Sequence, residues 1–268
     1  MSKGAVQSLL LLCLLAAAAG SETSETCTEE EGTALLDAAF NGRVDTVRDF
    51  LEKGVNPDLQ GRKGGTALII AAEKGYLDIV RLLLEKGANI DLQNKDGWTA
   101  LMAAAKDGHL YIVKALLEKG ADANLEGKDG VTALMFAARQ GHDNVVRALL
   151  EAGVNPDHQS KTGVSALMHA SVKGHVEAVW ALLEKGATVD LEAGKGGTAL
   201  ILASEKGHVD VVIALLQRGA NAEHKNKDGR DALSYAMGIT LSGLLNPKRP
   251  EVVDVLKAHL EDKAARAE

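Results

Sequence analysis

Eight histidines are the residues of this sequence best suited to chemistry, because an imidazole binds metals and transfers protons near neutral pH. Four of them directly follow a glycine and recur at one constant interval, and these are His109, His142, His175 and His208. Side chains that recur at this interval are too far apart to share one metal ion. The other four have no cysteine or carboxylate at ligand spacing, and these are His158, His169, His224 and His259. We therefore expect no metal site, and we interpret the recurrent histidines as structural.

Two further patterns resemble ligand-binding loops but lack a necessary part. Asp96-Gly97 is similar to a calcium loop, yet Leu92 stands five residues before the glycine and no glutamate follows at the bidentate position. The glycine-rich stretch 194–197 follows no predicted strand and lacks the full phosphate-loop spacing. No serine, threonine or cysteine shows a base and acid partnership. The sequence therefore predicts no catalytic residue, no cofactor and no small-molecule substrate.

The elements that position these residues form one repeating unit. In the unit from residue 99, Thr99 is a candidate N-cap, and Gly108 ends a short apolar helix. A second helix is predicted over 109–119 from its 3.6-residue apolar spacing, and Gly120 ends it. An extended loop follows and closes with the turn pair Asp129-Gly130.

The same unit recurs without a slip in register along most of the chain. Its N-cap position is held by Thr33, Thr66, Thr99, Thr132, Ser165, Thr198 and Asp231. The predicted repeats are 33–65, 66–98, 99–131, 132–164, 165–197, 198–230 and 231–261. Such a strict register indicates a solenoid of stacked repeats.

The repeat resembles the ankyrin family, whose motif T-P-L-H-x-A-A is matched here as T-A-L-M-x-A-A and is followed by G-H. The resemblance covers 33 to about 260 and implies an all-α solenoid of about seven helix-turn-helix units with β-turn fingers. Alanine replaces the motif proline. An apolar row replaces the motif histidine in all but the last repeat, and the residues at this position are Leu36, Ile69, Met102, Met135, Met168, Ile201 and Ser234.

The two ends of the chain depart from the repeat. Residues 1–20 have Lys3, an apolar run and a small-residue exit, which predicts a cleaved signal peptide. An uncleaved anchor or an intact N-terminus on a cytoplasmic protein are the alternatives. Residues 21–32 form an acidic leader before a capping first repeat. The seventh repeat carries an eight-residue insertion within 238–250, with Pro250 opening its last helix, and the charged tail 262–268 is predicted to fray.

Net charge argues against nucleic acid and anionic membrane as partners, because the chain carries −7 with a pI of about 5.7. In the ankyrin family, partners are usually bound by the concave side, which is made of fingers and first helices. By register, the candidate residues on that side are Arg62, Lys63, Lys95, Trp98, Lys106, Lys128, Arg139, Lys161, Lys195 and Lys227. Every finger carries a cation, so the partner is expected to be an acidic protein. The alternative is that these charges serve solubility.

Two tryptophans mark rival surfaces. The register assigns Trp98 to a finger tip, where other repeats have Gly, Val or Arg, so it is either an interface anchor or packs on a neighbouring finger. Trp180 and Ile213 replace the basic residues of one outward position on the second helix. They form an alternative convex patch, or fold down over Ala178 and Ala214.

The sequence thus predicts a non-catalytic protein interaction module that is exported, secreted or periplasmic, and binds a protein partner. A cytoplasmic or membrane-tethered scaffold or inhibitor is the alternative. A factor that acts on an enzyme through the loop 238–250 is a further one. Contact with a membrane is expected only if the N-terminus is not cleaved.

Overall fold

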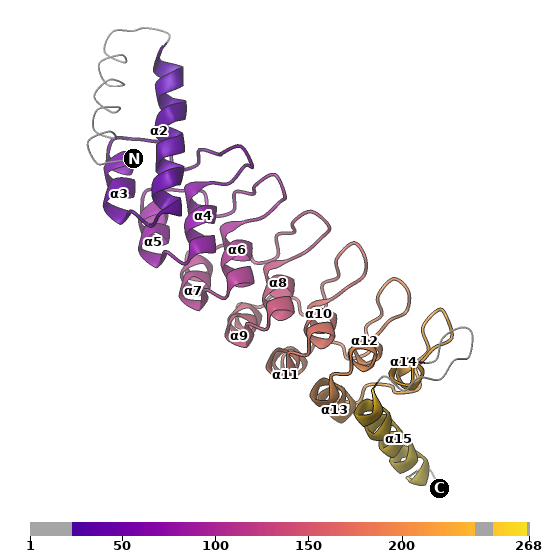
Figure 1. Ribbon diagram of the computed structural model, residues 1–268. Coiled ribbons are helices and arrows are strands. Elements are labelled where there is room, and N and C mark those ends of the chain that lie inside the picture. The colour runs from indigo at the N-terminus through magenta and orange to yellow at the C-terminus, as the bar shows by residue number, and fades with distance from the viewer. Residues whose placement is uncertain (1–22, 239–248, 267–268) are drawn as a thin grey trace. The chain divides into compact units, whose positions relative to one another are not determined.

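The computed structural model describes residues 23–238 and 249–266 (Figure 1). Within these residues every regular element is an α-helix, and consecutive helices pair and are separated from the next pair by a long loop. The predicted all-α fold of helix pairs and fingers is confirmed. The predicted signal peptide lies outside the described residues, as do residues 239–248 of the predicted insertion.

Each repeat begins with an inner helix and continues with an outer helix. The inner helices are α2 (Thr23–Phe40), α4 (Ala67–Lys74), α6 (Ala100–Asp107), α8 (Ala133–Gln140), α10 (Ala166–Lys173), α12 (Ala199–Lys206) and α14 (Ala232–Ala236). The outer helices are α3 (Val44–Glu52), α5 (Leu77–Glu85), α7 (Leu110–Glu118), α9 (Asp143–Glu151), α11 (Val176–Glu184), α13 (Val209–Gln217) and α15 (Pro250–Ala265).

The chain folds as two compact units. Unit 1 comprises Met1–Ala104 and Tyr111–Asp122, and unit 2 comprises Ala105–Leu110 and Ala123–Glu268. In unit 1, α4 packs against α2 and α5, and α3 packs against the same two helices. In unit 2, α8, α10, α12 and α14 pack in sequence as an inner row, and α9, α11, α13 and α15 pack in sequence as an outer row.

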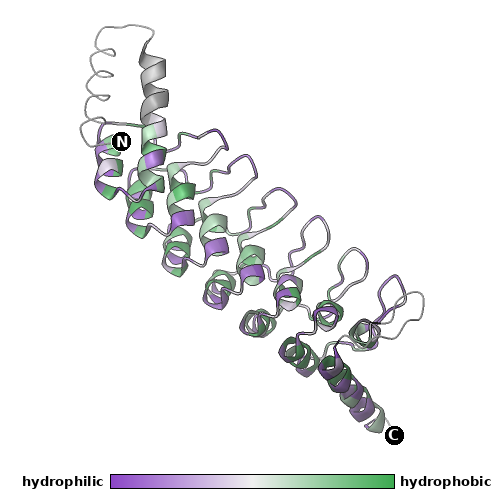
Figure 2. Cartoon of the chain, in the orientation of Figure 1, coloured by the Kyte–Doolittle hydropathy of each residue, from purple (hydrophilic) through white to green (hydrophobic). Residues whose placement is uncertain are grey.

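The core of each unit follows from the composition of the two helix types. Inner helices bury small residues beside one or two large ones, as α10 does with Ala170 and Ser171 beside Leu167 and Met168. Small side chains let neighbouring helices approach closely, and the branched residues of the outer helices fill the remaining space. Figure 2 shows hydrophobic residues concentrated on the helices and hydrophilic ones along the loops. The apolar row is buried as expected at its middle five positions, Ile69, Met102, Met135, Met168 and Ile201.

Most of the predicted N-caps form where a finger precedes the helix, but Thr132 makes no side-chain cap hydrogen bond. Thr66, Ser165, Thr198 and Asp231 each accept a hydrogen bond from the backbone N–H three residues on. The boundary predicted at Thr33 is wrong, because α2 runs through it from Thr23. The residues before Thr33 include three glutamates, which favour helix, and they lack the turn that precedes the later caps.

The last helix is also longer than predicted. Pro250 is its first residue, as expected, but α15 continues to Ala265, so the tail predicted to fray is largely helical. Lys263 donates a hydrogen bond to the Glu223 carboxylate, which ties this last turn to the loop before α14. The tail contains no helix breaker, and this contact gives it a partner in the stack.

Three recurrent histidines of unit 2 join consecutive repeats. The Nε2 atoms of His142, His175 and His208 lie 3.0, 3.2 and 2.9 Å from the carbonyl oxygens of residues 106, 139 and 172. These carbonyls belong to the last turn of the preceding inner helix, where no backbone N–H of the helix remains to satisfy them. The structural interpretation of these histidines is confirmed.

Candidate protein-binding surface

The fingers are the loops 61–65 and 94–98 in unit 1 and 127–131, 160–164, 193–197 and 226–230 in unit 2. Each is closed by a hydrogen bond from its first N–H to its last carbonyl, 2.9 to 3.0 Å long. A glycine with positive φ stands at the fourth position of each, as Gly163 does at +79°. This conformation favours glycine, and it lets the two arms of the finger turn back on each other.

Neighbouring fingers within a unit are joined by backbone hydrogen bonds. In unit 2, the N–H of Lys161 donates to Asp129 O at 2.8 Å, and the N–H of Lys227 donates to Lys195 O at 3.1 Å. In unit 1, the N–H of Lys95 donates to Lys63 O at 3.1 Å. The backbone of each of these tips is therefore fixed by its neighbour.

Aspartates at the bases of the fingers add a second ladder. In unit 1 the Asp58 carboxylate accepts the N–H of Asn89 at 2.8 Å. In unit 2 the Asp157 and Asp190 carboxylates accept the N–H groups of Thr188 at 2.7 Å and Asn221 at 3.0 Å. Each bond spans 31 residues and repeats with the register. Neighbouring loops are therefore joined by hydrogen bonds at their bases as well as at their tips.

The predicted basic residues of the fingers are exposed in both units. Those of unit 1 are Arg62, Lys63 and Lys95, and those of unit 2 are Lys128, Lys161, Lys195 and Lys227. On the inner helices of unit 2, Arg139 is exposed and Lys106 is half-buried. Lys227 also has a structural contact, because its Nζ donates to Gly194 O at 2.7 Å. The fingers thus present a series of cations to solvent, as the register predicts.

Trp98 does not occupy a finger tip, and that prediction is wrong. Its carbonyl accepts the closing hydrogen bond from Asn94, and its N–H donates to the Asn94 side chain at 2.9 Å. Trp98 therefore lies at the base of its finger, directly before the Thr99 cap, and its side chain is half-buried. The register alone places it in the loop, but the position of the closing hydrogen bond decides which residues form the tip.

The inner helices of unit 2 carry a solvent-facing stripe at positions i, i+3 and i+4, here called the inner-helix stripe. Its members are Phe136, Arg139 and Gln140 on α8, His169, Val172 and Lys173 on α10, and Leu202, Glu205 and Lys206 on α12. All are half-buried or exposed, while the residues between them are buried. This spacing places the three residues of each helix on one side of it.

The first member of each triplet was not predicted as a site residue. Phe136, His169 and Leu202 share one register position of consecutive repeats and are followed by half-buried Tyr235 on α14. The sequence carries a signal for them, because residues at this one position differ in chemistry from repeat to repeat. A position that the fold does not fix is free to specify a partner.

Within this stripe, His169 has an imidazole whose pKa is well below its ordinary value. Burial, the Arg139 guanidinium and the Lys173 ammonium together lower the pKa of its imidazole from 6.5 to about 4. The ring is therefore neutral at physiological pH. It lies in a positive field that comes from its own helix and from α8.

The comparison with protein families matches most of the chain. A family model described as ankyrin repeats (3 copies) matches residues 3–94, 35–126, 86–160, 120–193 and 167–259. The chain belongs to the ankyrin repeat family. Comparison with the curated proteins gave no significant match.

A solved structure supports the same assignment. The ankyrin repeat domain of human ASB11 superposes with a TM-score of 0.73 at 30% sequence identity. The match covers 84% of this chain and 96% of that domain. The ankyrin fold predicted from the register of the repeats is thus confirmed by both sequence family and structure.

The rival surface on the outer helices of this ankyrin protein is less open than its sequence suggests. Trp180 and Ile213 are both half-buried. The Arg218 guanidinium lies 5.0 Å from the centroid of the Trp180 ring and covers it. This cation–π contact accounts for the indole within unit 2 itself.

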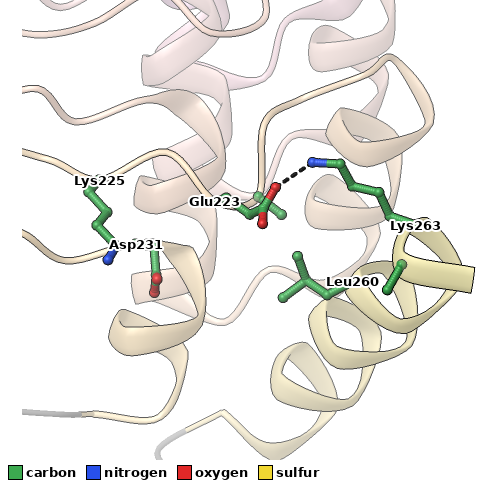
Figure 3. A pocket seen from close by; sticks show the side chains of 7 residues that line it. Glu223, Lys225, Asp231, Leu260 and Lys263 are labelled. Carbon is green, nitrogen blue, oxygen red and sulfur yellow. Dashed lines mark hydrogen bonds and ion pairs between the residues drawn. The ribbon is translucent and has the colours of Figure 1, made fainter. Parts of the chain in front are cut away.

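A cavity of about 560 Å³ lies at the C-terminal end of the ankyrin stack, between the loop before α14 and the last turns of α15 (Figure 3). Glu223, Lys225, Asp231, Leu260 and Lys263 are among its lining residues. Lys263 lowers the pKa of the Glu223 carboxyl, and Asp231 caps α14. The two acids thus stabilise the last repeat.

Across 23–238 and 249–266, no group of three His, Cys, Asp or Glu side chains is arranged to hold a metal ion. None of the helices in these ranges is both long and apolar enough to cross a bilayer.

Proposed function

We propose that this ankyrin repeat protein is an exported, non-catalytic interaction module that binds an acidic protein partner through its fingers and inner helices. Ankyrin repeats are generally protein–protein interaction modules, and their fold is typically non-catalytic. The observation that carries the proposal is the set of exposed cations on finger tips whose backbones are hydrogen-bonded to one another.

The finger ladder reduces the cost of binding. A loop that must be ordered by its partner loses conformational entropy on association, which weakens the complex. Here the tip backbones are already fixed by bonds such as Lys161 N–H to Asp129 O at 2.8 Å. The tip backbones therefore need no further ordering, and the charges of the exposed side chains favour encounter with an acidic surface.

Trp98 supplies the test of this surface. Replacing Trp98 by alanine is expected to weaken partner binding by about 2 kcal/mol, because a large aromatic side chain beside the tips is the usual type of interface anchor. The partner is first captured from the native compartment with the full chain, and its affinity for each variant is then measured by calorimetry.

Trp180→Ala is the matched control, since it removes the same side chain from an outer helix. It should lose the contact with Arg218 and some thermal stability, and keep the affinity. Loss of binding in Trp180→Ala with full binding in Trp98→Ala would move the site to the outer helices and overturn the proposal.

Export is the second part of the proposal, and residues 1–20 support it by their charge, apolar run and small-residue exit. We expect the mature chain to begin near Gly20 or Ser21. Intact-mass measurement of the protein purified from its native source decides this. A mature species that retains Met1 or Ser2 would favour a cytoplasmic or membrane-tethered scaffold instead.

A further inference from the structure

Charge is unevenly compensated along the inner-helix stripe of unit 2. Each of α8, α10 and α12 carries a base in its last turn, namely Arg139, Lys173 and Lys206. On α12 the base is neutralised by its neighbour, because Lys206 Nζ lies 3.1 Å from the Glu205 carboxylate. At the position of Glu205, α10 carries the uncharged Val172 and α8 carries Arg139 itself, so neither helix has an acid beside its base.

No carboxylate of the described chain lies within ion-pair distance of Arg139 or Lys173, and both side chains are exposed. The two bases are also neighbours. Helices α8 and α10 pack together, and His175, which follows α10, bonds to the carbonyl of Arg139 at 3.2 Å. The last turns of the two helices therefore lie side by side.

His169 completes this cluster. It stands one turn before Lys173 on the same side of α10, and its imidazole experiences the charges of both Arg139 and Lys173. The apolar residues of neighbouring helices at the same register are Phe136 and Leu202. Arg139 and Lys173, which are exposed, and His169, which is half-buried, thus lie on the neighbouring helices α8 and α10.

The helix dipole explains only part of this arrangement. A cation in the last turn interacts favourably with the negative end of any helix, which accounts for Arg139, Lys173 and Lys206 alike. It does not explain why the acid present on α12 is missing from α8 and α10. Nor does it explain a histidine placed where burial and the two bases disfavour its protonation. An anion supplied from outside would resolve both features.

We propose that Arg139, His169 and Lys173 form a binding site for a carboxylate of the protein partner. This inference rests on the proposed function and specifies the chemistry that the inner helices recognise. Arg139 presents parallel N–H donors that match the two oxygens of a carboxylate, and Lys173 adds a second charge. Phe136 and Leu202 on either side favour apolar residues next to the acid.

Protonation of His169 then couples to binding. The charged groups on the helices around it are Arg139 on α8, Lys173 on α10 and the neutralised Glu205–Lys206 pair on α12. A bound carboxylate would add a negative charge beside the two bases, so it raises the pKa of the imidazole. By linkage, binding takes up a proton and strengthens as the pH falls below neutrality. Each unit of upward shift increases the affinity up to tenfold.

The probe for the test is acetyl-hexaglutamate amide, which offers side-chain carboxylates only. Hexaglutamine with a free C-terminus offers one terminal carboxylate only. Comparing the two peptides distinguishes a site for side-chain carboxylates from a site for a C-terminal carboxylate. Because the whole chain carries −7, an acidic peptide has no general attraction to it, and binding reports a local site. The affinity of each fluorescent peptide is measured at pH 7.5 and 5.5, and the His169 ring protons are followed by NMR.

We expect hexaglutamate to shift the His169 signals, to raise the pKa of that imidazole and to bind more tightly at pH 5.5 than at 7.5, by about tenfold where the bound imidazole regains its ordinary pKa of 6.5. The double variant Arg139→Gln with Lys173→Gln should lose at least about tenfold in affinity, the effect of losing one charge-assisted bond or more. His169→Leu should lose the pH dependence of binding.

The charge-matched control is the double variant Lys185→Gln with Lys257→Gln, which removes two exposed cations that follow or lie on outer helices. It should bind hexaglutamate as the parent does. Equal losses in the two double variants, or unchanged His169 signals at saturation, would overturn the carboxylate site.

Failure of this site is separable from failure of the proposed function. If the native partner binds the variant with Arg139→Gln and Lys173→Gln normally and loses affinity only with Trp98→Ala, the interaction module stands and the carboxylate site is refuted. If hexaglutamate binds as expected while the native partner binds both the Arg139→Gln, Lys173→Gln variant and the Trp98→Ala variant with unchanged affinity, the carboxylate site exists but the partner-binding surface lies elsewhere.

Discussion

Replacing Gly141 by alanine is expected to lower the free energy of unfolding by about 3 kcal/mol, whereas Gly153→Ala is expected to lower it by only about 1 kcal/mol. Both glycines have positive φ, at +79° and +83°, so both substitutions introduce the same backbone strain. Their surroundings differ. Nothing lies within 4 Å of a Cβ at Gly153, but a Cβ at Gly141 meets the His175 ring at 2.5 Å.

The added methyl group at Gly141 must push the imidazole of His175 away. That ring lies in hydrogen-bonding contact with Arg139 O at 3.2 Å, so the substitution also breaks a bond between repeats. The loss therefore combines left-handed strain, overpacking and an unsatisfied carbonyl. Urea unfolding followed by circular dichroism measures the difference between the two variants.

The double variant Gly141→Ala with His175→Ala provides the control. Removing the ring makes room for the methyl group, so the combined loss should be smaller than the sum of the single losses. Additive losses, or equal losses in the Gly141 and Gly153 single variants, would show that the glycine is needed only for its backbone conformation.

The second large effect is a loss of stability on acidification that depends on His169. The folded state holds the pKa of this imidazole at about 4, below its ordinary value of 6.5. The unfolded state therefore binds a proton more readily. Its contribution to stability is complete above pH 6.5 and decreases as the pH falls towards 4, by roughly 2 to 3 kcal/mol in total.

Urea unfolding of the parent and of His169→Leu at pH 7.5 and pH 4.5 isolates this contribution, because other titrating groups are common to both chains. Leucine is suited to this position, since Leu202 stands at the same register on α12. The variant should lose less stability on acidification than the parent.

Arg139→Gln is a graded control, because it removes one cause of the low pKa and should reduce the pH dependence in part. Identical pH profiles for the parent and His169→Leu would show that His169 titrates normally and is not held neutral by its neighbours.

The sequence by itself determined the repeating architecture of this protein. The constant interval between repeats, the Thr or Ser caps and the glycine after each helix predicted the paired helices of the middle repeats. These signals are local, since a cap bonds to a backbone N–H only three residues away, as Thr66 does. Pro250 predicted the first residue of the last helix for the same reason.

Only the tertiary structure decided what happens between repeats. The contacts of His175 with Gly141 and Arg139 join residues of different repeats, which no local pattern specifies. The position of Trp98 at the base of its finger, and not at the tip, depends on the hydrogen bond that its carbonyl accepts from the N–H of Asn94.

The two end repeats and the candidate site were likewise predicted only in part from the sequence. The extension of α2 through Thr33 and of α15 to Ala265 went unpredicted, because end repeats lack one neighbour and follow different constraints. The exposed finger cations could be found from the register alone. The cluster of Arg139, His169 and Lys173 could not, because its properties depend on the packing of α8 against α10 and on the burial of the His169 ring.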